Sequence, residues 1–241
     1  MGSDMPQHIG IVACSAEGAA LCYRTICIEG ADLMGPHAHP EVSIHTHCLA
    51  DYMRYIRADD WKGVAELMLS SADKLSKMGA DFLISPDNTI HRAYEFVAER
   101  SPLPWLHIAQ EVANQAHQSG YHRLGVLGTR YTMEGPVYPQ KLAAAGIDYR
   151  MPGPKERERI DQIIMDELVY GTFTPRSLAY FTEVIRELKD DGCDAVVLGC
   201  TEIPLLVTPE SSPLPTLDST RLLARAALRK AVGTTRQSIA I

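Results

Sequence analysis

The chain has 241 residues, of which 46% are hydrophobic and 22% charged, as in ordinary globular proteins with a sizeable core. A formal net charge of −7 gives no basic field for nucleic acid, and no apolar run approaches the ~20 residues that span a bilayer. We therefore expect neither a nucleic-acid nor a membrane partner. The start of the chain lacks signal-peptide character and the cysteines lack CxxC spacing, which predicts a cytoplasmic protein with reduced thiols.

The first half of the chain alternates short apolar strands with amphipathic helices. Residues 8–13 form an apolar strand that ends in a polar turn with Ser15, and a helix follows the turn. Further strands are expected at residues 41–47 and 101–107, and helices at residues 61–78, 91–100 and 109–119. This order is typical of an α/β fold with a mainly parallel sheet.

The second half follows the same scheme. We expect a strand at residues 123–127, helices at 135–145, 157–170, 175–191 and 219–232, and a loop with a short strand at 205–215. Asp218 or Thr220 is placed to cap the last helix, which we expect to return to the first half. The tail from Gly233 is polar and is expected to fray.

Two eleven-residue stretches, 79–89 and 192–202, look like copies of one another. Each has a helix-ending Gly, an Asp, an apolar run and then a polar triplet, so that Asp87 aligns with Cys200. The copying predicts two pseudo-symmetric αβ domains, formed by residues 1–110 with 216–241 and by residues 111–215. Ligands of open α/β sheets bind at the carboxyl ends of strands, so we expect Asp87 and Cys200 to face each other across an interdomain cleft.

Cys200 and Asp87 are the candidate reactive groups, and each has a plainer interpretation. A short helix after Cys200 would lower the pKa of its thiol through the helix dipole, whereas an ordinary buried cysteine would be inert. Asp87 precedes a helical segment and could simply cap it, although Asn88 or Thr89 could cap in its place.

A histidine-rich strand adds a third candidate. His45 and His47 lie on one face of the strand and could bind a metal, but no HExxH or CxxC partner accompanies them. We therefore expect no metal, and we interpret His45 as part of a polar strand end that lines the cleft. The chain also lacks GxGxxG and GxxxxGK[ST], so no nucleotide cofactor is expected.

Two motifs resemble those of a known family: Pro-Asp87-Asn-Thr-Ile-His91 and Leu-Gly-Cys200-Thr-Glu-Ile203. They are similar to the PCNTxH and GCTE motifs of the aspartate/glutamate racemase family, within the Asp/Glu/hydantoin racemase superfamily. Residues 127–133, 163–168 and 217–221 also resemble that family, in the same order. The resemblance implies two αβ domains, an interdomain site, a homodimer, and amino-acid racemisation without pyridoxal phosphate or metal.

The resemblance also implies roles for individual residues. Cys200 corresponds to one of two acid/base cysteines, and Asp87 replaces the other. Polar residues of the motifs would bind the substrate, and they are Ser15, Asn88, Thr89, Thr129, Thr201 and Glu202. Glu41 stands where relatives that use acidic substrates carry arginine, and Thr172-Phe173 stand where those relatives carry lysine, which predicts a substrate with a neutral or cationic side chain.

Two other functions stay open at this point. One is a one-thiol enzyme like the arylmalonate decarboxylases, which keep only the second cysteine and protonate an enediolate after CO₂ loss. The other is a relative that binds an amino acid without turning it over. A carboxylate can act readily as a base, but it can act as an acid only if its pKa is raised, so Asp87 is central to this choice.

Overall fold

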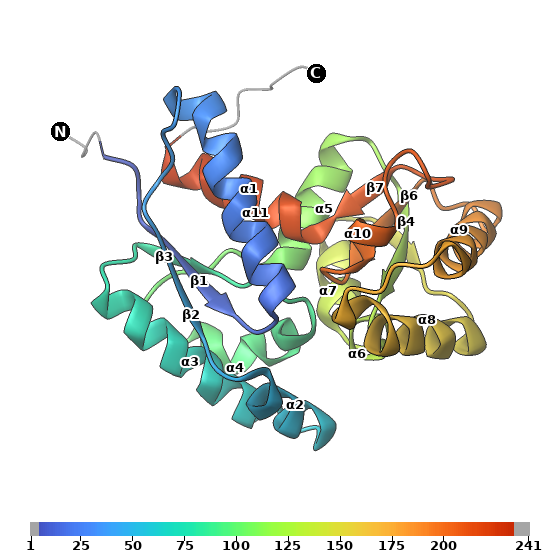
Figure 1. The fold of residues 1–241 in the computed structure, drawn as a ribbon, viewed down its shortest axis with the longest axis horizontal. Coiled ribbons are helices and arrows are strands. Elements are labelled where there is room, and N and C mark those ends of the chain that lie inside the picture. The colour runs from blue at the N-terminus through green and yellow to red at the C-terminus, as the bar shows by residue number, and fades with distance from the viewer. Residues whose placement is uncertain (1–4, 234–241) are drawn as a thin grey trace. The chain divides into compact units, whose positions relative to one another are not determined.

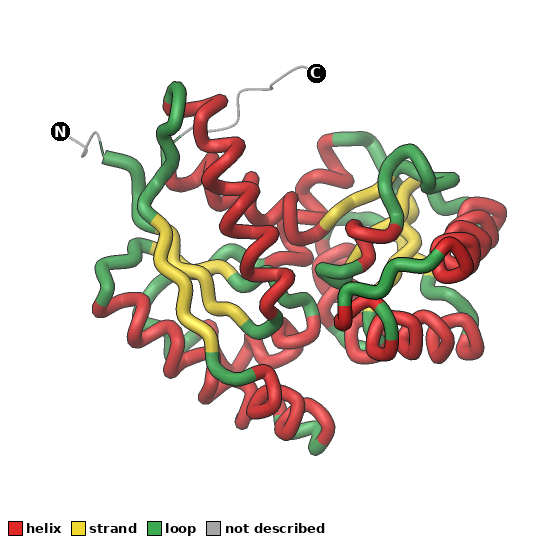
Figure 2. Tube along the Cα trace, in the orientation of Figure 1, coloured by secondary structure: helices red, strands yellow, loops and turns green. Residues whose placement is uncertain are grey.

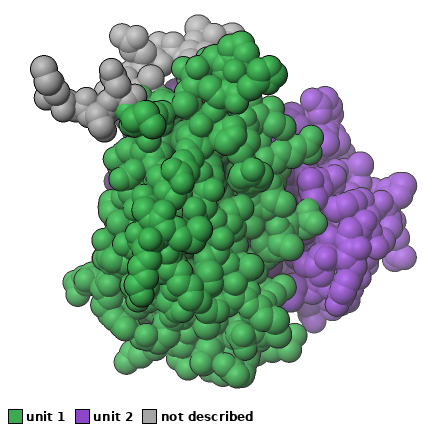
Figure 3. Space-filling view, turned by 60° about the vertical axis from the view of Figure 1, so that its left-hand side comes forward, with its two compact units in different colours: residues 1–86, 93–107, 223–241 green, residues 87–92, 108–222 purple. Residues whose placement is uncertain are grey.

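The computed structural model describes residues 5–233. Except for Gly233, the tail expected to fray lies outside them. The chain forms two compact units (Figure 3). Unit 1 is described over residues 5–86, 93–107 and 223–233, and unit 2 over residues 87–92 and 108–222. The segment 87–92, which carries the first polar triplet, thus belongs to the same unit as Cys200.

Unit 1 contains a parallel sheet with the order β2-β1-β3 (Figures 1 and 2). Its strands are β1 (Ile9–Ala13), β2 (Val42–Thr46) and β3 (Phe82–Ile84). Its helices are α1 (Ala16–Met34), α2 (Leu49–Arg57), α3 (Trp61–Lys77) and α4 (Tyr94–Ala98). The strand expected at 101–107 is wrong, since only one bridge joins Trp105 to Leu83. Pro102 and Pro104 lack the N–H groups that a longer ladder would need.

Unit 2 contains a parallel sheet with the order β5-β4-β6-β7. Its strands are β4 (Arg123–Gly128), β5 (Asp148–Arg150), β6 (Ala195–Gly199) and β7 (Thr216–Asp218). Its helices are α5 (Ile108–Gln118), α6 (Arg130–Met133), α7 (Val137–Ala144), α8 (Pro154–Asp166), α9 (Pro175–Asp190) and α10 (Ile203–Leu206). The last helix, α11 (Ser219–Ala231), begins in unit 2 and continues in unit 1.

Side-chain alternation along β6 explains how its sheet is covered on both faces. Val196 and Leu198 join a buried cluster with residues of α8 and α9. Ala195 and Val197 instead join a buried cluster with residues of α5 and α7. Because successive strand residues point to opposite faces, an uninterrupted apolar strand is what a sheet covered by helices on both sides requires.

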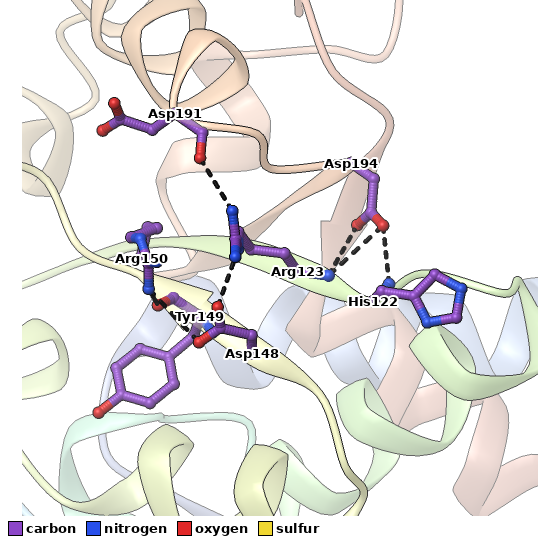
Figure 4. A network of polar contacts seen from close by, with 7 residues as sticks. All are labelled: His122, Arg123, Asp148, Tyr149, Arg150, Asp191 and Asp194. Carbon is purple, nitrogen blue, oxygen red and sulfur yellow. Dashed lines mark hydrogen bonds and ion pairs between the residues drawn. The ribbon is translucent and has the colours of Figure 1, made fainter.

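The internal repeat is confirmed at the level of backbone contacts. Gly79 and Gly192 end α3 and α9 with φ values of 91° and 84°, a region that favours glycine. The carboxylate of Asp81 then accepts a hydrogen bond of 2.7 Å from the backbone N–H of His8. The carboxylate of Asp194 accepts one of the same length from the N–H of His122 (Figure 4).

The repeat also includes two Ser-Pro-Leu-Pro segments, 101–104 and 212–215, that the sequence reading did not pair. Pro104 accepts a backbone hydrogen bond of 2.8 Å from Leu83, and Pro215 accepts one of 2.9 Å from Val196. The order β2-β1-β3 with the bridge at Trp105 therefore matches β5-β4-β6-β7 strand for strand. Both halves thus have one topology.

Charged side chains form a network of hydrogen bonds and ion pairs at the amino-terminal ends of the strands of the unit 2 sheet (Figure 4). Arg123 donates to Asp148 at 2.8 Å and to the carbonyl of Asp191 at 3.2 Å. Arg150 forms a second ion pair with Asp148. Exposed pairs of this kind contribute ~0–1 kcal/mol each, so this network aligns strand ends more than it stabilises the fold.

Several helix boundaries differ from those expected. The helix expected at 91–100 is divided into a 3₁₀ turn, Thr89–Ala93, and α4, and the one expected at 157–170 ends at Asp166, before a second 3₁₀ turn, Leu168–Tyr170. Helix α2 and strand β5 were not expected. Asp218 caps α11 by accepting from the N–H of Arg221 at 3.0 Å, as expected. Among residues 5–233, none of the helices has the length and apolarity to cross a membrane.

Candidate active site

The carboxyl-terminal edge of the unit 2 sheet brings two site candidates together. Strands β4 and β6 pair up to Gly128 and Gly199, so Thr129 and Cys200 leave the sheet side by side. The glycines permit this close approach, because a Cβ on Gly199 would lie 2.7 Å from the carbonyl oxygen of Leu127. A Cβ on Gly128 would lie 2.9 Å from the carbonyl oxygen of Gly199.

Cys200 lies in a hydrogen-bonded group with the two residues that follow it. Its thiol donates to Oε2 of Glu202 at 2.9 Å, and the hydroxyl of Thr201 donates to the same oxygen at 2.7 Å. Thr201 and Glu202 are both buried, whereas Cys200 reaches the surface in part. One carboxylate oxygen of Glu202 therefore accepts from both of its neighbours in sequence.

The surroundings of Cys200 hold its thiol in the protonated form. Burial raises the pKa of Cys200 well above its ordinary value, and the charges of Glu202 and Asp87 raise it further. The expectation that a helix dipole lowers this pKa is wrong. The helix that follows, α10, has only 4 residues, and burial and two nearby carboxylates outweigh its effect.

Three threonine hydroxyls gather beside this group. Thr89 lies 3.1 Å from Thr129 and 3.4 Å from Thr132, and Thr129 lies 3.3 Å from Thr132, between hydroxyl oxygens in each case. Thr129 also caps α6 by accepting from the N–H of Thr132. Thr132 is buried, whereas Thr89 and Thr129 are partly exposed, so the hydroxyls of these two can rotate to donate to a carboxylate or another small anion.

Asp87 and Asn88 have different environments although they are neighbours. Asp87 is half-buried and lies close enough to Cys200 for its charge to raise the pKa of that thiol. Asn88 is buried, and its side chain accepts from Tyr138 at 2.6 Å and donates to Ser219 at 3.0 Å. The side chain of Asn88 is thus held within the protein, which leaves its predicted role as a substrate donor without support.

The remaining candidates belong to unit 1. Ser15 follows β1 and caps α1 by accepting from the N–H of Gly18 at 3.3 Å. His45 lies near the carboxyl end of β2, where its Nδ1 lies 2.9 Å from Ser71 and its Nε2 lies 3.0 Å from Lys74. Since an ammonium only donates, Nε2 accepts from Lys74, and His45 is neutral. Burial and the charge of Lys74 lower the pKa of His45 accordingly.

Glu41 lies at the opposite edge of the unit 1 sheet. It precedes the first residue of β2, its carbonyl accepts from the N–H of Ile9, and its carboxylate lies 3.8 Å from the ring of His8. Its side chain is 74% exposed. Ligands of parallel sheets meet the carboxyl ends of strands, so the placement of Glu41 against a substrate loses its basis.

Comparisons with known proteins identify the family of this chain. The family model for Asp/Glu/Hydantoin racemase matches residues 11–227. A broad specificity amino-acid racemase of Bacillus subtilis, RacX, is 24% identical over 70% of this chain and 73% of its own length. A glutamate racemase of Desulforudis audaxviator is 25% identical over 60% of this chain, and the match spans 54%, or about half, of that protein.

A solved structure gives the same result for the fold. The crystal structure of a candidate Asp/Glu racemase from Yersinia pestis is 30% identical, with 94% of this chain and 99% of that chain covered, and the TM-score is 0.87. The fold is thus that of the two-domain racemases, and the chain belongs to the Asp/Glu/hydantoin racemase family. In general terms, this membership supports an isomerase that racemises amino acids.

Sequence reasoning missed three residues of the site. Thr132, Tyr138 and Ser219 are each less than 2% exposed and each bonds to a residue of the first triplet or its neighbours. Thr132 and Ser219 lie inside segments that resemble the family, so the signal was present. Tyr138 carried no signal, because a lone tyrosine beside two prolines reads as the start of a helix.

Proposed function

We propose that this protein racemises or epimerises an amino acid without pyridoxal phosphate or metal, with Asp87 and Cys200 as the two acid/base groups. The observation that carries the proposal is the Cys200 thiol hydrogen-bonded to Glu202 within range of the Asp87 charge. Next to them, the hydroxyls of Thr89 and Thr129 would receive the substrate carboxylate, and the buried hydroxyl of Thr132 would support both. Hydroxyl donors there stabilise the enediolate-like charge that develops when Cα loses its proton.

The proton transfers follow from the resting states of the two groups. Asp87, as a carboxylate, takes the Cα proton from one face, and the electron pair delocalises into the substrate carboxylate. The protonated Cys200 thiol then delivers its proton to the opposite face, leaving a thiolate and a neutral Asp87. Substrate of the other handedness reacts through the reverse transfers. The thiolate, next to Glu202, is strongly basic and recovers a proton readily.

The charges around Cys200 favour an amino acid over the substrates of a decarboxylase. Both charges that raise its pKa are carboxylates, Glu202 and Asp87. The α-ammonium of an amino acid offsets these two negative charges and so lowers the free energy of the thiolate that forms during turnover. An arylmalonate has two carboxylates and no cation, so it would add repulsion instead. The decarboxylase is therefore the second candidate.

The finer identity of the substrate and the assembly are also proposals. Thr172 and Phe173 provide no cation, which supports a substrate whose side chain is neutral or cationic. Roles for Ser15 and His45 in substrate binding, a homodimer and a cytoplasmic location remain predictions from the sequence.

A test by isotope exchange separates these functions. The wild-type protein is incubated in D₂O with each amino acid, and the loss of the α-proton signal is followed by nuclear magnetic resonance. A racemase exchanges the α-proton of at least one amino acid and inverts its configuration. Phenylmalonate is tested in parallel for CO₂ release. Release of CO₂ without any exchange would overturn the proposal in favour of a decarboxylase, and the absence of both would favour a binding protein.

A further inference from the structure

A buried series of hydrogen bonds joins the loop that carries Asp87 to strand β6, which Cys200 follows. The hydroxyl of Tyr138 donates to Oδ1 of Asn88 at 2.6 Å, and Nδ2 of Asn88 donates to the hydroxyl of Ser219 at 3.0 Å. Ser219 donates in turn to the carbonyl oxygen of Leu198 at 3.0 Å. Asn88 is the sequence neighbour of Asp87, and Leu198 lies two residues before Cys200, so these hydrogen bonds link the two candidate reactive groups through the backbone.

The chemistry of its groups allows only one direction for this series. The carbonyl of Leu198 can only accept, so Ser219 must donate to it and accept from the amide of Asn88. The amide oxygen then faces Tyr138, whose hydroxyl must donate. Tyr138 keeps its proton, because full burial raises the pKa of this phenol. One orientation of Asn88 is thereby fixed.

Burial makes this arrangement costly to disturb. Tyr138 and Ser219 are completely inaccessible to solvent, and Asn88 is 3% exposed. A buried polar group that loses its partner has no water to replace it. The ring of Tyr138 also packs under the site, since a Cβ on Gly199 would lie 3.5 Å from its Cε2. Tyr138 therefore lies against both the segment that carries Asp87 and the segment that carries Cys200.

We propose that Tyr138, Asn88 and Ser219 form a clamp that sets the distance between Asp87 and Cys200, with Tyr138 as its positioning residue. The inference rests on the proposed function for its catalytic meaning, but the distance itself can be tested without a substrate. The charge of Asp87 contributes to the protonation of the Cys200 thiol. If the clamp is loosened, Asp87 can move away from Cys200, and its charge then has less effect on the thiol. The thiol should therefore ionise at lower pH.

The test uses Tyr138→Phe, which keeps the buried ring and removes only the hydroxyl. Alkylation of Cys200 by iodoacetamide is followed from pH 6 to 11 by mass spectrometry of its peptide, and α-proton exchange is measured with the amino acid that wild type uses. We expect the midpoint of alkylation to fall by at least about half a pH unit and kcat to fall at least tenfold, with KM changed less than threefold. Tyr149→Phe, a half-buried tyrosine of the same unit, is the control and should match wild type.

Ser219→Ala removes another hydrogen bond of the same series. It is the deciding variant if Tyr138→Phe does not fold, as judged by the absence of cooperative unfolding. The two substitutions should not add in their effect on kcat, because each removes one of the two partners that hold the side chain of Asn88. A wild-type midpoint together with wild-type kcat in either folded variant overturns the clamp. A shifted midpoint in a protein whose wild type exchanges no amino acid supports the clamp while the proposed function fails.

Discussion

Replacing Glu202 by glutamine tests the electrostatic state of the site most directly. The substitution keeps an acceptor oxygen for Cys200 and Thr201 and removes one charge 2.9 Å from the thiol sulfur. Two unit charges about 4 Å apart interact by about 4 kcal/mol at an effective dielectric of about 20. That energy corresponds to about three pKa units, at 1.36 kcal/mol each. Allowing for relaxation and screening, we expect the pKa of Cys200 to fall by at least about one unit.

The assay follows the modification of Cys200 by iodoacetamide as a function of pH. The midpoint is compared rather than the rate, because a thiolate of lower pKa is also a weaker nucleophile. In α-proton exchange, the alkaline limb that reports loss of the Cys200 proton should move to lower pH by the same amount. Glu210→Gln removes an exposed carboxylate of the same unit and should change neither profile. An unchanged midpoint in Glu202→Gln would refute the view that this carboxylate helps to hold the thiol protonated.

Three further substitutions test the site and its frame. Cys200→Ala should lower exchange by at least ~10²-fold without loss of fold, and activity above about a tenth of wild type would contradict its assignment. Asp87→Asn should lower exchange to a similar extent at unchanged stability, whereas a loss of stability alone would indicate a capping role. Gly199→Ala forces a Cβ to 2.7 Å from the carbonyl of Leu127, so we expect a loss of ~1–3 kcal/mol in urea unfolding. Gly125→Ala meets only the end of a leucine side chain at 2.8 Å and should cost less; equal losses would contradict the backbone argument.

The fold could be predicted because its signals are local and repeated. The helix-ending glycines Gly79 and Gly192, and the aspartates two residues later, have the same backbone environment in both halves. Apolar runs of strand length between helices fixed the parallel sheets. Helix α2 was missed although Leu49, Tyr52, Met53 and Ile56 recur at helical spacing, so its signal was present in the sequence and was not used.

The chemistry of the site could be predicted only in part, because it depends on contacts between distant segments. The placement of Thr129 beside Cys200 follows from strand register, which requires the pairing of β4 with β6. The direction of the pKa shift of Cys200 depends on burial and on Glu202, and a local dipole argument gave the wrong sign. Tyr138 entered the site through a buried hydrogen bond across 50 positions of the sequence.

The replacement of one cysteine by Asp87 predicts an asymmetry between the two directions of racemisation. A carboxylic acid has a reference pKa of ~3.9 and a thiol ~8.5, and burial raises that of Cys200 further, so the resting enzyme carries its proton on sulfur. The two enantiomers of an amino acid have equal free energies, so kcat/KM must be equal in both directions. The enantiomer whose α-proton faces Cys200 needs a thiolate there, but it binds mostly to enzyme in which Cys200 is protonated and Asp87 is ionised. This unproductive binding lowers its kcat and its KM together.

We expect kcat for the two enantiomers to differ at least about tenfold, and to approach one another in Asp87→Cys, where two thiols compete for the proton on more equal terms. Circular dichroism gives kcat and KM for each enantiomer of the same amino acid. Equal kcat values in wild type would mean that Asp87 is as readily protonated as Cys200. In that case, its environment must raise its affinity for protons by several pKa units, and the resting arrangement proposed for the pair would have to be abandoned.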